Sequence, residues 1–234
     1  MDTLTKFAED IFSSVGRASP SLPSKPLTGF LPMRGSLYTG ELMVVGRAVN
    51  GWDTSIEASE LSSPEKVREY IAEVWASVSS PTSDMSWVTD RWGKGDGGYN
   101  TRRSAFWRVI RSCVKELSIA DVESDSWPQH LTWSNLYKIS PSSGNPGARL
   151  RRVQEKSCVV LLQAEIAHFK PKRLLFLTGG WEDPFLSTSC VTRDATAGTF
   201  KHSDGFLTRY VVAPHPMGKK ESPIVENVVS LFNQ

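Results

Sequence analysis

The sequence predicts an α/β fold, a three-layer sandwich in which helices flank a mainly parallel, four-stranded central sheet. Four short apolar runs suit buried strands, and the segments between them are long enough for crossover helices. The runs span 42–45, 132–136, 174–177 and 210–213. The first and the last run end in polar loops, and ligands bind outside the carboxyl ends of the strands in an open parallel sheet. We therefore expect loops that are far apart in the sequence to form one site.

Helices are predicted from apolar residues at helical spacing and from capping signals. An expected helix over 3–15 is followed by a Pro/Ser-rich stretch, so that residues 1–30 form an N-terminal helix and strap. Ser63-Pro64-Glu65 is typical of a helix start, and this helix is expected to end near Ser79. The other expected elements are a helix over 101–117, a helix from the 141–147 loop to about residue 169, a long aromatic loop over 81–100, and a hairpin or flap over 188–208.

Length and composition predict a single domain over 1–234. The chain has 234 residues, of which 39% are hydrophobic, and this suffices for one sizeable core. The net charge is +2, so contact with nucleic acid requires a local cluster of cations. Three widely spaced cysteines suit neither a disulfide framework nor a zinc or iron–sulfur site. With no apolar run long enough for a bilayer and no secretory signal, we expect a soluble, cytoplasmic protein. We also expect a monomer that uses no cofactor.

Polar residues that can carry chemistry lie in the loops after the first and last expected strands and near the end of the second expected strand. The loop after 42–45 contains Asn50, which is part of an Asn-Gly turn signal, and Asp53, which either caps a turn or activates water. Asn135 in the second strand has an amide that donates and accepts side by side, so it either satisfies backbone groups or reads the edge of a base. His215 lies between two prolines in a rigid loop after the last strand.

These residues and their order resemble the uracil-DNA glycosylase superfamily over roughly residues 40–220. The resemblance implies a DNA glycosylase that flips a nucleotide and hydrolyses its N-glycosidic bond to leave an abasic site. In this family a residue of the first loop holds the water, a strand-borne Asn reads the flipped base and a late His stabilises the leaving base. The matching positions are Asn50 or Asp53 for water, Asn135 for the base and His215 for the leaving group. The resemblance implies no metal ion and no iron–sulfur cluster.

The loop after the first expected strand differs from the family pattern, and this difference bears on which base the protein would excise. The family uses a compact Gly-x-x-Pro-Gly or Gly-Gln-Asp-Pro-Tyr element, whereas Arg47-Ala48-Val49 intervene here, the proline is absent and a Trp follows Asn-Gly. Two substrates therefore stay open: a uracil-like base, as in DNA repair, or a bulky modified cytosine such as the glucosylated hydroxymethylcytosine of phage DNA, as in anti-phage defence. The residues expected to bind the base are Gly46, Arg47, Trp52, Trp87 and Asn135.

The expected DNA contact combines an apolar wedge with cations. Met217 follows the His215 loop and suits a wedge that replaces the extruded nucleotide. Lys219, Lys220, Arg102 and Arg103 are expected to hold the backbone phosphates. Two alternatives remain open: a hydrolase acting on free nucleosides or nucleotides, and a catalytically inactive DNA-binding module of the same fold.

Overall fold

The computed structural model describes residues 2–79, 85–95, 98–186, 192–193 and 196–234. The chain divides into two compact units that alternate along the sequence. Unit 1 comprises Met1–Pro32, Gly46–Ser80 and Ser134–His168. Unit 2 comprises Met33–Val45, Pro81–Trp133 and Phe169–Gln234. The domain count predicted from the sequence stays a prediction.

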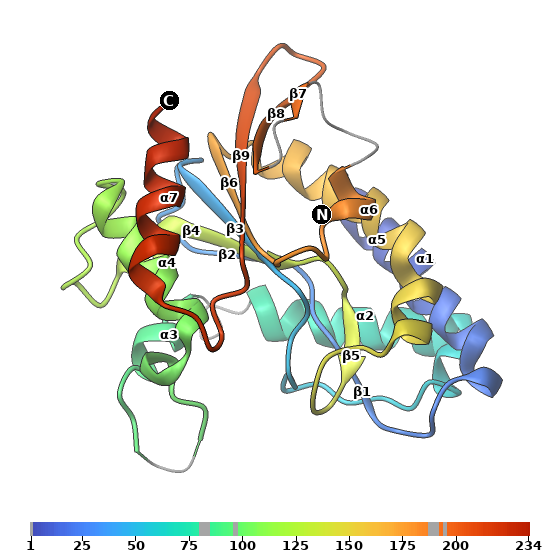
Figure 1. Cartoon of the computed structure of the whole chain (residues 1–234). Coiled ribbons are helices and arrows are strands. Elements are labelled where there is room, and N and C mark those ends of the chain that lie inside the picture. The colour runs from blue at the N-terminus through green and yellow to red at the C-terminus, as the bar shows by residue number, and fades with distance from the viewer. Residues whose placement is uncertain (1, 80–84, 96–97, 187–191, 194–195) are drawn as a thin grey trace. The chain divides into compact units, whose positions relative to one another are not determined.

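Unit 2 is built on a mixed sheet whose strand order is β2-β4-β3-β6-β9-β8-β7 (Figure 1). Gly46 at the end of β3 and the last two residues of β4 are counted with unit 1. The strands are β2 (Met33–Arg34), β3 (Leu42–Gly46), β4 (Leu131–Asn135), β6 (Arg173–Leu177), β7 (Thr192–Arg193), β8 (Ala197–Lys201) and β9 (Leu207–Ala213). The predicted α/β class is thus confirmed.

The strands β3, β6 and β9 are parallel neighbours, and their carboxyl ends lie along one edge of the sheet. Val45 of β3 pairs with Phe176 of β6, and Leu177 of β6 pairs with Ala213 of β9. The strand β3 is buried over its whole length, as continuous apolar runs in parallel sheets are. All four strands expected from the sequence are present, with boundaries that differ by at most three residues.

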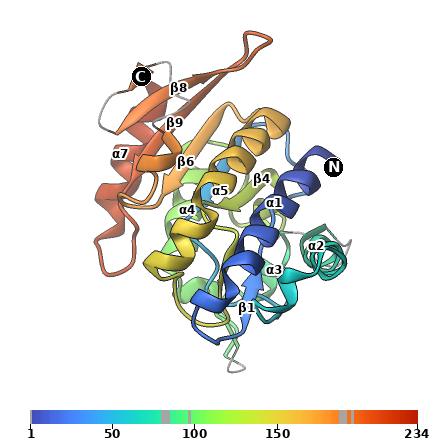
Figure 2. The ribbon, with the colours of Figure 1, turned by 90° about the vertical axis from the view of Figure 1, so that its right-hand side faces the viewer.

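The prediction of a four-stranded sheet is wrong in strand number, and the sheet is mixed, although the expected strands β3, β6 and β9 are parallel. The sheet has seven strands, and β2, β7 and β8 pair antiparallel with their neighbours. Both β2 and β7 have two residues, which is too short for a periodic signal. The strands β8 and β9 form a hairpin (Figure 2), which fits the expected hairpin or flap. Of that expected flap, 188–191 and 194–195 lie outside the described residues.

The helices of unit 2 differ in two places from the sequence-based prediction. The helix expected over 101–117 is split into η3 (Thr101–Arg103) and α4 (Ala105–Glu116), because Ser104 between them is extended at ψ 115°. The loop expected over 81–100 contains α3 (Trp87–Asp90), while its residues 81–84 and 96–97 lie outside the described part. The helices α4 and α7 pack side by side (Figure 1). The remaining helices of this unit are η4 (Trp127–His130), α6 (Asp183–Leu186) and α7 (Glu221–Asn233).

Unit 1 combines three long helices with a small sheet. The helices α1 and α2 pack against each other (Figure 2), and the predicted starts and ends of the expected helices agree within a few residues. Within the expected strap, Leu27, Thr28 and Gly29 form β1, which pairs antiparallel with β5. The elements are α1 (Asp2–Ala18), η1 (Ser19–Ser21), β1 (Leu27–Gly29), η2 (Glu60–Ser62), α2 (Pro64–Ser79), β5 (Ile139–Pro141) and α5 (Ala148–Phe169), whose last residue is counted with unit 2. No helix among the described residues combines the length and the apolarity that a bilayer crossing requires.

Two buried thiols provide a first test of the structure. Burial raises the pKa of Cys113 in α4 to about 12 and that of Cys158 in α5 to about 12. At pH 8 only about one such thiol in 10⁴ is ionised, and the thiolate is the reactive form. We expect iodoacetamide to label both residues at least about 10²-fold more slowly in the native protein than in urea. Mass spectrometry of the two tryptic peptides measures the rates, and equal rates in both conditions would contradict the burial.

Candidate functional site

Within unit 1, the first loop lies beside the carboxyl end of β4. The Leu136 N–H donates to the Gly46 carbonyl at 2.9 Å, and the Tyr137 N–H donates to the Arg47 carbonyl at 3.0 Å. The two segments therefore run in the same direction, as expected for neighbouring parallel strands. The carboxyl end of the Asn135 strand thus adjoins the residues that follow β3.

Asn135 at the end of β4 has a buried side chain whose amide nitrogen lacks a hydrogen-bond partner among the described residues. The residue is 1% exposed, and this nitrogen is fully enclosed. A buried donor without an acceptor costs about 1–3 kcal/mol, so native proteins rarely retain one without a reason. A ligand that presents an acceptor, such as the carbonyl oxygen of a base, removes this cost when it binds.

The Asn135 backbone is held by a buried ion pair. The Lys138 ammonium donates to the Asn135 carbonyl at 2.7 Å and to the Ser134 hydroxyl at 2.7 Å. It also lies 2.8 Å from a carboxylate oxygen of Glu165 in α5, and the side chains of Lys138 and Glu165 are 0% exposed. The Ser134 hydroxyl donates to Glu165 at 2.7 Å. Burial raises the pKa of Glu165, while Lys138 and the Ser134 hydrogen bond act in the opposite direction.

A second side chain of α5 holds the backbone that follows. Gln154 is fully buried, and its side-chain oxygen accepts the N–H groups of Lys138 at 3.1 Å and Ile139 at 3.0 Å. Its amide nitrogen donates to the Ile139 carbonyl at 2.7 Å. Two side chains of α5 thus hold Lys138: Glu165 contacts its ammonium and Gln154 accepts its backbone N–H. The segment after Asn135 therefore has little freedom to shift.

Asn50 joins the first loop to the loop that follows β5. Its side-chain oxygen accepts the Gly144 N–H, and the Ser140 hydroxyl donates to the Val49 carbonyl at 2.7 Å. Gly51 adopts φ 84°, and a Cβ there would lie 2.7 Å from the Ser142 carbonyl oxygen. The structure thus gives Asn50 a contact that joins the two loops. Asp53 is exposed in the same loop.

The two tryptophans expected to stack on a base are both half-buried and packed against other aromatic rings. Trp52 lies edge-on to Phe30, with ring centroids 5.0 Å apart, and its indole N–H donates to Ser77 at 3.0 Å. In unit 2, Trp87 packs against Trp107 at 5.3 Å and Trp133 at 5.7 Å. Each ring therefore has an internal packing role, and base stacking by either stays a prediction.

In unit 2, the His215 loop follows β9 at the carboxyl edge of the parallel strands. The Gly179 N–H from the loop after β6 donates to the Ala213 carbonyl at 3.2 Å, so these two loops are neighbours. His215 is half-buried, and its Nδ1 lies 3.4 Å from the Met217 N–H that donates to it. Acceptance at Nδ1 places the proton of a neutral imidazole on Nε2, and this makes Nε2 a donor.

A tight turn carries Met217 outward from this loop. The Lys219 N–H donates to the Pro216 carbonyl at 3.0 Å, and Gly218 adopts φ 73°. Met217 is 77% exposed, the highest exposed fraction among the large apolar side chains that are exposed in the described part of the chain. Lys219 is exposed beside it.

Arg108 of α4 connects the start of α7 with η3. Its guanidinium donates to both carboxylate oxygens of Glu221 at 2.5 to 3.1 Å and to the Arg102 carbonyl at 2.7 Å. Lys220 directly precedes Glu221, and Arg103 follows Arg102 in η3. The exposed cations expected to contact DNA therefore come together within unit 2: Arg102, Arg103, Lys219 and Lys220.

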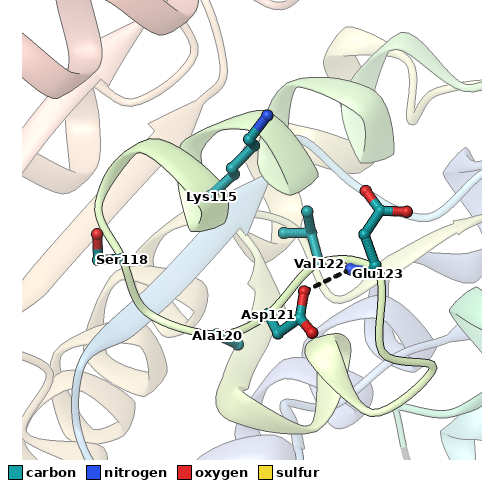
Figure 3. A pocket seen from close by; sticks show the side chains of 6 residues that line it. All are labelled: Lys115, Ser118, Ala120, Asp121, Val122 and Glu123. Atoms are coloured by element: carbon teal, nitrogen blue, oxygen red, sulfur yellow. Dashed lines mark hydrogen bonds between the residues drawn. The ribbon is translucent and has the colours of Figure 1, made fainter.

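Unit 2 also has a separate hollow of about 500 Å³ at the end of α4 (Figure 3). The Asp121 carboxylate there accepts the Glu123 N–H at 3.0 Å, and Glu123 forms an ion pair with Arg111 at 2.8 Å. The carboxylates are thus engaged in local contacts. None of the site residues predicted from the sequence lines the hollow, whose lining is Lys115, Ser118, Ala120, Asp121, Val122 and Glu123.

Comparison with known proteins gives no assignment. No protein-family model matches this chain, and no curated protein matches it either. Among the described residues, no three His, Cys, Asp or Glu side chains come together in a way that could hold a metal ion.

The sequence-based prediction missed three residues that shape these sites: Lys138, Glu165 and Arg108. Lys138 lies within a run of ten buried residues, and a lysine between apolar neighbours was the available signal. Glu165 follows Leu161 and Leu162 on the buried stripe of α5, where a charge indicates a buried partner. Arg108 carried no comparable signal, because its partner Glu221 is 113 residues away.

Proposed function

We propose that this protein is a DNA glycosylase that flips a pyrimidine-type nucleotide and hydrolyses its N-glycosidic bond. The proposal includes the three-layer arrangement of the uracil-DNA glycosylase superfamily, which the sequence motifs resemble. The products are the free base and an abasic site in DNA. The base is either uracil-like or a bulky modified cytosine.

The observation that supports this proposal most strongly is the buried, partnerless amide of Asn135. A donor at the carboxyl end of a strand, beside the loop after β3, suits recognition of a base edge. The side chain also carries an acceptor oxygen, and a donor and an acceptor together match the hydrogen-bonding edge of a pyrimidine. An extruded base supplies both complementary groups.

Hydrolysis requires stabilisation of positive charge on the sugar and negative charge on the departing base. We assign the first task to Asp53, whose exposed carboxylate orients water and stabilises the cation. His215 has the second task, because a proton on Nε2 donates to the leaving base. Asn50 holds the first loop through its contact with Gly144.

Variants of the first loop separate water activation from loop positioning. We expect Asp53→Ala to lower the rate of single-turnover excision by about 10²-fold or more, because a preorganised group is lost. Asn50→Ala is expected to have a smaller effect, since the Ser140 contact with Val49 remains. Rapid-quench measurement of abasic sites gives both rates. Full activity in an Asp53→Ala/Asn50→Ala double variant would show that the water is held elsewhere.

Base flipping also needs groups that stabilise the opened duplex, and unit 2 offers them together. Met217 at the tip of its turn has the exposed apolar character of a wedge. Four exposed cations belong to the same unit, two in η3 and two before α7, and Arg108 contacts the Arg102 carbonyl in η3 and Glu221 at the start of α7. Phosphate binding by such a cluster gives affinity without sequence preference.

Variants of this turn test the DNA contact. We expect Met217→Ala to impair excision from duplex DNA about 10-fold more than from single strands, because only the duplex must be opened. Lys219→Ala/Lys220→Ala is expected to reduce the slope of log affinity against log salt concentration by about two. Lys115→Ala/Lys156→Ala provides the control with the same charge change elsewhere. An unchanged salt slope in the Lys219/Lys220 variant would remove the turn from the DNA contact.

The proposed activity is tested by incubating the purified protein with oligonucleotides that carry uracil, hypoxanthine, hydroxymethylcytosine or glucosylated hydroxymethylcytosine. Alkaline cleavage reveals abasic sites, and mass spectrometry identifies the released base. Release from free nucleosides without a DNA requirement would instead support the nucleoside hydrolase. Tight binding to modified DNA without any abasic site would support the inactive binding module.

A further inference from the structure

We propose that Lys138 and Glu165 act as a positioning pair that fixes the peptide group between Asn135 and Leu136 and thereby directs the Asn135 amide toward the substrate base. This inference rests on the proposed base-reading role of Asn135. Neither residue of the pair touches the base in this proposal. Their effect on substrate recognition passes through the backbone of Asn135.

The three N–H bonds of the Lys138 ammonium all have acceptors. They are the Asn135 carbonyl at 2.7 Å, the Ser134 hydroxyl at 2.7 Å and the Glu165 carboxylate at 2.8 to 3.0 Å. An ammonium with three buried acceptors has one low-energy placement, because any rotation leaves a donor unpaired. The Asn135 carbonyl is thus tied to a fixed point on α5 through Glu165.

The peptide group between Asn135 and Leu136 is held at both of its polar ends. Its carbonyl accepts from Lys138 at 2.7 Å, and its N–H donates to the Gly46 carbonyl at 2.9 Å. A planar peptide that is held at both ends cannot rotate about its flanking bonds without losing a hydrogen bond. The plane fixes ψ of Asn135 and, together with the preceding peptide group in β4, the direction of the Cα–Cβ bond from which the amide extends.

A purely structural role explains this pair poorly. Burying a lysine and a glutamate is expensive, and apolar residues of similar volume stabilise a core as well or better. An apolar pair, however, cannot donate to the Asn135 carbonyl. The ion pair therefore supplies something that packing does not, namely a fixed hydrogen-bond donor to the backbone of the residue that reads the base in the proposed function.

The test replaces the pair by apolar residues and measures both catalysis and the state of Asn135. The variant Lys138→Met/Glu165→Leu keeps the volume of the core and removes the donor. We expect its single-turnover excision rate to fall at least about 10-fold while its DNA affinity stays the same. We also expect Asn135→Ala to cost much less in this background than in the wild type, because the amide is no longer directed.

A readout independent of catalysis is the side-chain NH₂ signal of Asn135 in a ¹⁵N–¹H spectrum, assigned by its loss in Asn135→Ala. We expect this signal to shift or broaden in the double variant and to stay in place in the control variant Lys66→Met/Glu69→Leu, which removes an exposed ion pair of α2. If the double variant does not fold, Ser134→Ala removes one contact of Lys138 and keeps both charges, and the same shift is expected.

The outcomes separate the two proposals. An unmoved Asn135 signal together with full excision in the double variant overturns the positioning role and leaves the glycosylase proposal intact. A shifted signal in a protein whose wild type releases no base from any oligonucleotide supports the positioning of Asn135 and overturns the glycosylase proposal. Loss of activity with an unmoved signal and an unchanged cost of Asn135→Ala also overturns the positioning role.

Discussion

Asn135→Ala is expected to lower single-turnover excision by about 10²- to 10³-fold, the largest effect on activity of any single change proposed for this protein. The expected loss is that of a buried, preorganised hydrogen-bond donor. Asn135→Asp is expected to be about as inactive, because a carboxylate keeps the acceptors and loses the donor. The control is Asn227→Ala, which changes an exposed asparagine of α7 and should leave the rate unchanged.

The same position distinguishes binding of a ligand from structural support. If Asn135 supported the fold, its removal would lower the free energy of unfolding. Its amide nitrogen has no partner among the described residues, so Asn135→Leu, which has similar volume, is expected to raise the free energy of unfolding by about 1–2 kcal/mol. Urea titration measures this change. A stable but inactive Asn135→Leu variant is the expected result, and a destabilised one would indicate a structural role.

The elements that the sequence predicted well are those whose signal is local. The four apolar strands and the long helices stand out because burial imposes a pattern on every few residues. The two-residue strands β2 and β7 carry no such pattern, and their pairing depends on neighbours elsewhere in the chain. The break at Ser104 within the expected helix over 101–117 had a local signal that the apolar spacing concealed, because Ser104 occupies the N-cap position of α4, where serine is common.

The candidate site was predictable in its residue types and not in its contacts. The position of Asn135 at a strand end follows from the sequence, but the absence of a partner for its amide appears only in three dimensions. The Asn-Gly turn signal at Asn50 predicted a turn as readily as catalysis, and the contact with Gly144 favours the structural role. Lys138 and Glu165 are 27 residues apart, so their pairing required the fold.

Lys138→Met alone is expected to lower the free energy of unfolding by about 3–5 kcal/mol, because it leaves Glu165 buried without its counter-charge. The double variant Lys138→Met/Glu165→Leu is expected to recover most of this loss, since it removes both charges and fills the space. Urea unfolding followed by circular dichroism measures each value. A loss below about 1 kcal/mol in the single variant would show that water reaches the pair.

The pH dependence of the single variant provides a sharper form of this test. Burial raises the pKa of Glu165 and Lys138 opposes that rise, so in Lys138→Met the folded-state pKa is higher still. At pH values between the pKa of Glu165 in the unfolded state and its higher pKa in the folded state, the native state binds more protons than the unfolded state. The free energy of unfolding therefore falls as the pH rises through this window. The slope for one carboxyl group is at most about 1.4 kcal/mol per pH unit. We expect Lys138→Met to be less stable at pH 8 than at pH 5 relative to the wild type. The double variant has no carboxyl group at this position and should lack the extra slope, so an equal slope in both variants would assign it to another group.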